Sequence, residues 1–180
     1  RAAEPEGTEQ RLWSRHVAGL QVLNGPLDVP VLVSRLLALL DTSAALAQQL
    51  PARANREPTP AGRTPLEIAY HVPQVVVGFL DAALGGRLAR EHLDRRPPEH
   101  IATGADVAQL TRSVTQALAV WWGANRLRLP AEVDTYAGRR PLLQLLEHTT
   151  THVARHVRQL QLLLEQLGVS PRPSLHPALL

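Results

Sequence analysis

The hydrophobic residues of this chain recur every three or four positions rather than every second one, which is the pattern of amphipathic helices. The predicted long helices cover residues 28–50, 64–84, 103–128 and 141–168. No stretch shows the alternation expected of a strand. Four long helices with short connections predict an all-α four-helix bundle, and a further amphipathic stretch adds an extra N-terminal helix.

The same pattern divides the chain into three parts. Residues 1–27 form an N-terminal helical extension or linker with a modest helix at 8–23, residues 28–168 form the bundle, and residues 169–180 form a proline-broken tail. Within the bundle, residues 87–102 are expected to hold a short helix followed by a loop. Residues 130–140 are expected to be a loop. We therefore expect a single hydrophobic core.

The clearest helix start lies at Thr64-Pro65-Leu66-Glu67. A hydroxyl at the cap, a proline in the first turn and a glutamate three residues on form a capping box. Gly85 follows the last apolar position and is expected to end this helix. Thr103 and Asp106 repeat the start signal for the next long helix.

Composition excludes several kinds of chemistry. The chain has no cysteine, and all 19 of its basic residues are arginine. A disulfide scaffold, a thiolate metal site, a Schiff-base lysine and a P-loop are therefore excluded. A net charge of only +3, without a dense basic stripe, argues against nucleic-acid binding.

The sequence also bears on location and partners. No apolar run is expected to reach the length that spans a bilayer, and the polar start does not resemble a secretory signal, so we expect a cytoplasmic protein with no membrane partner. Because the chain begins with Arg1, an upstream domain in the same chain is left open. Broad apolar faces leave room for a homodimer.

Eight histidines are the remaining candidates for chemistry. His148, His152 and His156 follow one another at intervals of four, so neighbouring members stand on one helix face about 6 Å apart and can share one metal ion. His148 and His156 are about 12 Å apart along the axis, which requires a third ligand from another helix. His71 is the candidate, because it shares a helix face with core residues. The alternative is that each histidine only hydrogen-bonds a neighbouring polar group.

These residues resemble a known family. The run His152-Val-Ala-Arg-His156-Val-Arg-Gln159-Leu160 resembles the late-helix signature of the DinB/YfiT-like superfamily, and the segment ending at His71 is similar to its second-helix segment. The resemblance implies an up-down-down-up four-helix bundle with a metal site at His71, His152 and His156. Where that family often has His-Arg-Gly-Gln, this chain has His156-Val-Arg-Gln159.

Three neutral imidazoles leave a coordination position open and the double charge intact, which is typical of catalytic metal sites. Zinc or nickel is expected from the nitrogen ligands. Two reactions follow: hydrolysis by an activated water, or S-transfer with a low-molecular-weight thiol such as bacillithiol or mycothiol, which the resemblance favours. The substrate would be a small molecule.

Two further residues are candidates for catalytic roles, Glu67 as a proton acceptor and Tyr136 as a substrate contact. The alternative to an enzyme is a non-enzymatic interaction or regulatory module. The stretch Thr135-Tyr136-Ala-Gly138 resembles a branch of the family with an attached glutaredoxin-like domain, and the resemblance leaves open that such a domain is the partner of the module. Four histidines are expected at the surface: His16, His92, His100 and His176. Trp121 and Trp122 cannot both face the core.

Overall fold

The structure, a computed structural model, describes residues 28–55, 57–59 and 62–173. The helix expected at 8–23 lies outside these residues, as do His16 and His176. The N-terminal part of the proposed domain division therefore stays a prediction. All elements described below belong to the bundle region and the start of the tail.

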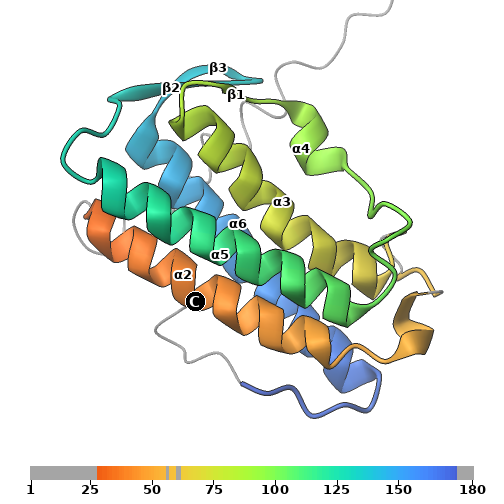
Figure 1. Cartoon of the computed structure of the whole chain (residues 1–180). Coiled ribbons are helices and arrows are strands. Elements are labelled where there is room, and N and C mark those ends of the chain that lie inside the picture. Colours follow the sequence, from red (N-terminus) through yellow and green to blue (C-terminus); the bar gives the residue numbers. More distant parts are fainter. Residues whose placement is uncertain (1–27, 56, 60–61, 174–180) are drawn as a thin grey trace, which may run out of the picture.

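Four long helices dominate the fold and match the predicted segments within a few residues (Figure 1). They are α2 (Val29–Gln48), α3 (Pro65–Ala83), α5 (Gly104–Asn125) and α6 (Leu142–Gln166). The short elements are η1 (Ala52–Asn55), α4 (Arg90–Asp94) and three strands. The chain is thus mainly helical, as the hydrophobic pattern predicts.

The predicted helix signals act as expected at both ends of α3. The Thr64 hydroxyl accepts from the Glu67 backbone N–H at 3.2 Å, and the Glu67 carboxylate accepts from the Thr64 N–H at 2.7 Å. Gly85 follows the helix with a φ of +93°, a conformation that L side chains rarely adopt. Thr103 and Asp106 form the same box at the start of α5. Local sequence therefore sets the limits of α3.

The long helices pack side by side around one core. α2 contacts both α5 and α6, and α3 also contacts both α5 and α6. Phe79 of α3 meets Trp121 of α5 edge to face, with ring centroids 5.3 Å apart. Trp121 is buried and Trp122 is only half-buried, so one tryptophan of the pair faces the core as expected.

Contacts at the helix ends show how the helices run relative to one another. Gly104, at the start of α5, lies so close to the Ala47 carbonyl near the end of α2 that an added Cβ would collide with it. The Gln49 side chain, just after α2, donates to the Arg172 carbonyl and accepts from the Arg172 N–H, beyond α6. α2 and α6 therefore end together, and α5 begins beside them.

The end of the molecule opposite the C-terminal ends of α2 and α6 carries a small sheet, which the hydrophobic pattern does not predict. Its strands are β1 (Arg87–Leu88), β2 (Glu132–Thr135) and β3 (Gly138–Pro141). β1 pairs parallel with β2, and β2 pairs antiparallel with β3. Because β1 follows α3 and β2 follows α5, these two helices end at the same side, where α6 begins (Figure 1).

One expectation is wrong here, because residues 130–140 hold two strands rather than only a loop. The small sheet is an addition to a mainly helical chain, which stays consistent with the expected all-α class. The stretch Glu132-Val-Asp-Thr135 does alternate between exposed and buried side chains, but four residues are too short a run to stand out. Gly138, with a φ of +91°, allows the tight turn between β2 and β3. The pairing with β1 depends on residues about 47 positions apart, which no local pattern encodes.

The short helix α4 lies against α3 and corrects a second expectation. His92 was expected at the surface, but its side chain is only 16% exposed. Its Cβ lies so near Gly78 of α3 that a Cβ there would be 3.1 Å away, and its Nδ1 accepts from the Ala89 N–H at 3.2 Å. His92 thus helps to dock α4, whereas His100 is exposed as expected.

α2 bears on the expectation that no segment could span a bilayer. By length and composition alone, this helix of 20 residues is long and apolar enough to do so, which makes that expectation wrong as stated. Half of the apolar stretch is buried in the fold, where Leu32, Leu36 and Leu39 face α5 and α6 as core residues. A buried core helix passes the same test of length and composition.

Candidate metal centre

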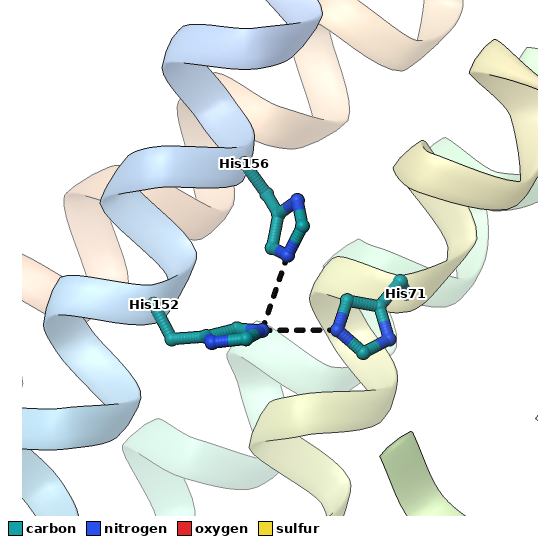
Figure 2. A group of neighbouring side chains, drawn as sticks. All are labelled: His71, His152 and His156. Carbon is teal, nitrogen blue, oxygen red and sulfur yellow. Dashed lines mark hydrogen bonds between the residues drawn. The ribbon is translucent and has the colours of Figure 1, made fainter. Parts of the chain in front are cut away.

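Three histidines from two helices converge between α3 and α6 (Figure 2). His71 lies in the second turn of α3 and is 5% exposed. His152 and His156 lie one turn apart in the middle of α6 and are half-buried. The packing of α3 against α6 therefore brings the predicted histidines together.

The three rings turn their Nε2 atoms toward one another. The Nε2 atom of His152 lies 3.0 Å from Nε2 of His71 and 3.1 Å from Nε2 of His156. One ligand atom from each of the three residues lies within 4.8 Å of the others. The site is thus a compact triangle of ring nitrogens.

Hydrogen bonding among the rings cannot account for both close distances at once. A ring nitrogen carries either one N–H or one lone pair in its plane, so Nε2 of His152 can be one end of only one linear hydrogen bond. A cation at the centre would accept all three lone pairs together. Zinc bound tetrahedrally at about 2.0–2.1 Å holds its ligand nitrogens roughly 3.3 Å apart, close to the 3.0 and 3.1 Å that separate Nε2 of His152 from the other two rings. The residues therefore fit a divalent metal ion.

Gln159 orients one of the three rings. Its Oε1 lies 3.0 Å from Nδ1 of His156, one turn back on α6. Because the amide oxygen only accepts, Nδ1 of His156 donates, and its lone pair is left on Nε2, which faces the cluster. Such a contact is typical of metal-binding histidines. The sequence motif included Gln159, but this role emerges only from the structure.

The rings are held in their neutral form. Burial lowers the pKa of His71 to about 4, with His156 and Arg63 adding to the shift, while the Leu93 backbone raises it. The pKa of His152 is lowered to about 3, mainly by burial and also by the neighbouring histidines and Arg155. Burial also lowers the pKa of His156, although the hydrogen bond to Gln159 opposes the shift. Near neutral pH all three can offer lone pairs.

The surroundings of the cluster are positively charged. Arg63 acts on His71 and His156, and Arg155 acts on His152 and His156. Within the described part of the chain, the metal-competent group contains no carboxylate. A divalent ion here would therefore keep its full charge and favour an anionic ligand. No sequence pattern singles out Arg63, since nothing local distinguishes a loop arginine.

The two residues predicted to be catalytic take other positions. The Glu67 carboxylate bonds the Thr64 N–H in the capping box and lies 3.9 Å from Nε of Arg96. Tyr136 lies between β2 and β3, half-buried against the core. Since His152 is ten residues into α6, the sheet end is about 15 Å from the cluster along the helix axis. The structure does not bring Tyr136 to the histidines.

His148 lies next to the cluster but not in it. Its ring centroid is 5.9 Å from that of His152, and its charged form would lower the pKa of His152. The metal-competent group among the described residues consists of the other three histidines. Of the two pairs that the spacing allows on α6, the packing selects His152 with His156.

Comparison of the chain with family models, with curated proteins and with solved structures found no match. The class of site is therefore defined by the geometry on its own: a partly buried three-histidine group that could hold a metal ion, between two helices of a mainly helical protein.

Proposed function

We propose that this chain is a DinB/YfiT-like metal-dependent enzyme that activates a small-molecule thiol for S-transfer, or a water molecule for hydrolysis. The observation that carries the proposal is the convergence of three Nε2 atoms from α3 and α6. Zinc and nickel are the ions that this all-nitrogen ligand set favours. The metal ligands are His71, His152 and His156.

The arrangement of the helices supports the family proposal. α2 and α6 end at one side of the molecule, and α3 and α5 end at the other. An up-down-down-up four-helix bundle has this order of directions. The ligand histidines come from the second and fourth of the long helices, as the family resemblance implies.

The chemistry follows from the charges at the site. A divalent ion held by three neutral imidazoles supplies a Lewis acid with a position open to a fourth ligand. Arg63 and Arg155 add positive charge and no carboxylate balances it within the group, so a thiolate suits the site better than a neutral ligand. Because the chain has no cysteine, the thiol must come from a small molecule or another domain.

Glu67 is the acid nearest to His71 along α3, but its carboxylate is engaged at the helix start and near Arg96. We assign it to the cap rather than to proton transfer. The Arg63 and Arg155 guanidiniums lower the pKa of an approaching thiol, so deprotonation needs no strong base from the chain.

The test begins with elemental analysis of the purified protein. We expect about one zinc or nickel ion per chain, lost in His71→Ala and in His152→Ala. His148→Ala is the matched control, because its ring neighbours His152 on the same helix face, and it should retain the ion. Full retention in either ligand variant would overturn the three-histidine site.

The reaction is tested by screening electrophiles with glutathione, mycothiol and bacillithiol, and without any thiol. Thiol-dependent turnover that disappears in His152→Ala supports the transferase. Turnover without thiol supports the hydrolase. A metal-free wild type without turnover would overturn the enzyme and favour a non-enzymatic module.

A further inference from the structure

The two helices that form the centre share a spacing that the proposed function does not use. In α6, His156 is followed three residues later by Gln159, and in α3, His71 is followed three residues later by Gln74. Like His71, Gln74 is only 5% exposed. A buried glutamine on an otherwise apolar helix face needs a hydrogen-bond partner.

The two pairs differ in their hydrogen bonding. Oε1 of Gln159 lies 3.0 Å from Nδ1 of His156. In α3, Nδ1 of His71 and Oε1 of Gln74 are both buried, and among the described residues neither makes a hydrogen bond of ordinary geometry. Nδ1 of His71 is a donor when Nε2 of the same ring carries the lone pair, and Oε1 of Gln74 is an acceptor. Two complementary buried groups are therefore left unpaired one turn apart.

Helix geometry places these groups within reach of each other. Residues three apart are neighbours on a helix surface, and helical side chains lean toward the N-terminus, so the Gln74 amide leans back over His71. The same spacing closes the hydrogen bond in α6. A side-chain rotation of Gln74 is the change needed to close it in α3.

We propose that Gln74 is a positioning residue, whose Oε1 accepts the Nδ1 proton of His71 and holds the Nε2 lone pair toward the metal. The inference rests on the proposed metal centre. The backbone of Leu93 in α4 is the competing acceptor, because its interaction with His71 raises the pKa of that ring, although it does not reach ordinary hydrogen-bond geometry at Nδ1. The two acceptors make different predictions for a Gln74 variant.

The experiment measures zinc affinity by competition with a chelator in wild type, Gln74→Leu and Gln159→Leu. Leucine keeps the volume of glutamine but cannot accept a hydrogen bond. We expect each substitution to weaken zinc binding about 10–100-fold, as loss of a contact behind a ligand does. Gln74→Glu, which keeps an acceptor, should restore affinity to within about tenfold of wild type.

A readout that packing alone would not change is the histidine tautomer, measured by ¹⁵N NMR. We expect Nδ1 of His71 to carry the proton in wild type, and the tautomers to mix in metal-free Gln74→Leu. The wild-type measurement stands even where a variant fails to fold. A wild-type His71 protonated on Nε2 in the presence of zinc would overturn the proposal.

The outcomes separate this inference from the proposed function. If Gln159→Leu loses zinc affinity while Gln74→Leu keeps it, Gln74 does not position His71, and the Leu93 carbonyl is the acceptor instead. The metal centre would then stand. If wild type binds no zinc or nickel, the proposed function fails, and the role of Gln74 at a metal fails with it.

Discussion

α3 presents two different faces to its neighbours. Toward α5 it packs Phe79 edge to face against Trp121, an apolar contact with both rings buried. Toward α6 it places His71 against His152 and His156. The first contact buries one ring N–H, Nε1 of Trp121, which has no hydrogen-bond partner among the described residues. The second brings three imidazoles together, with their Nε2 atoms close to one another.

The difference separates a contact that maintains the fold from one that could hold a metal ion. The face toward α5 stabilises α3 through apolar burial, which needs no partner atoms. The face toward α6 buries polar nitrogens whose pKa values are lowered by that burial. A protein selected only for stability would place leucines there. The histidine face is therefore the one on which the proposed function depends.

The largest effect expected of a single substitution comes from the apolar face. Phe79→Ala should lower the free energy of unfolding by about 3–5 kcal/mol, because it leaves a cavity beside Trp121. Chemical denaturation measures the loss, and Phe79→Leu should lose less. Zinc affinity of the folded variant should change less than threefold. A large change in affinity would mean that the two faces of α3 are not independent.

The next effect belongs to the histidine face. Zinc at about 100 times its Kd should raise the free energy of unfolding of wild type by about 2.7 kcal/mol. His152→Leu should show no such rise, because it removes the nitrogen central to the cluster. Without metal, we expect His152→Leu to be at least as stable as wild type. A metal-free variant several kcal/mol less stable would show that the histidines hold the helices together by themselves.

Acid should weaken the histidine face selectively. The folded pKa values of His71 and His152, about 4 and about 3, lie below the ordinary value of 6.5, so the unfolded chain takes up protons first. The metal-free protein should have its full stability above pH 6.5 and lose up to about 1.4 kcal/mol per pH unit for each group as pH falls toward those values.

Denaturation of the metal-free protein between pH 7 and pH 4 measures this slope. His152→Gln should reduce it, whereas His100→Gln, at an exposed position, should leave it unchanged. An equal slope in wild type and His152→Gln would contradict the buried neutral state.

The smallest effect concerns the start of α3, which both faces share. Thr64→Ala removes the hydroxyl that caps the helix and should lower the free energy of unfolding by about 1 kcal/mol. Thr103→Ala, in the equivalent box of α5, is the matched control and should lose a similar amount. If Thr64→Ala also weakens zinc binding and Thr103→Ala does not, the cap at the start of α3 helps to position His71.

Much of the fold could be predicted because its signals are local. Thr64 with Glu67 and Thr103 with Asp106 start helices through contacts within one turn, and Gly85 ends one through its own backbone conformation. The small sheet could not, since β1 pairs with a strand that α5 separates from it in sequence. His92 was misplaced for the same reason, because its burial depends on the packing of α4 over Gly78.

The sequence by itself determined the four long helices and the set of histidines that one helix face can present, because both follow from the 3.6-residue repeat. Only the tertiary structure decided that His71 meets His152 and His156 while His148 stands aside. That choice depends on how far α3 is shifted along α6, which is set by the packing of whole helix surfaces. The tertiary structure likewise decided that Gln159 orients the ring of His156, since a hydrogen bond requires atoms at defined positions rather than residues at a given spacing.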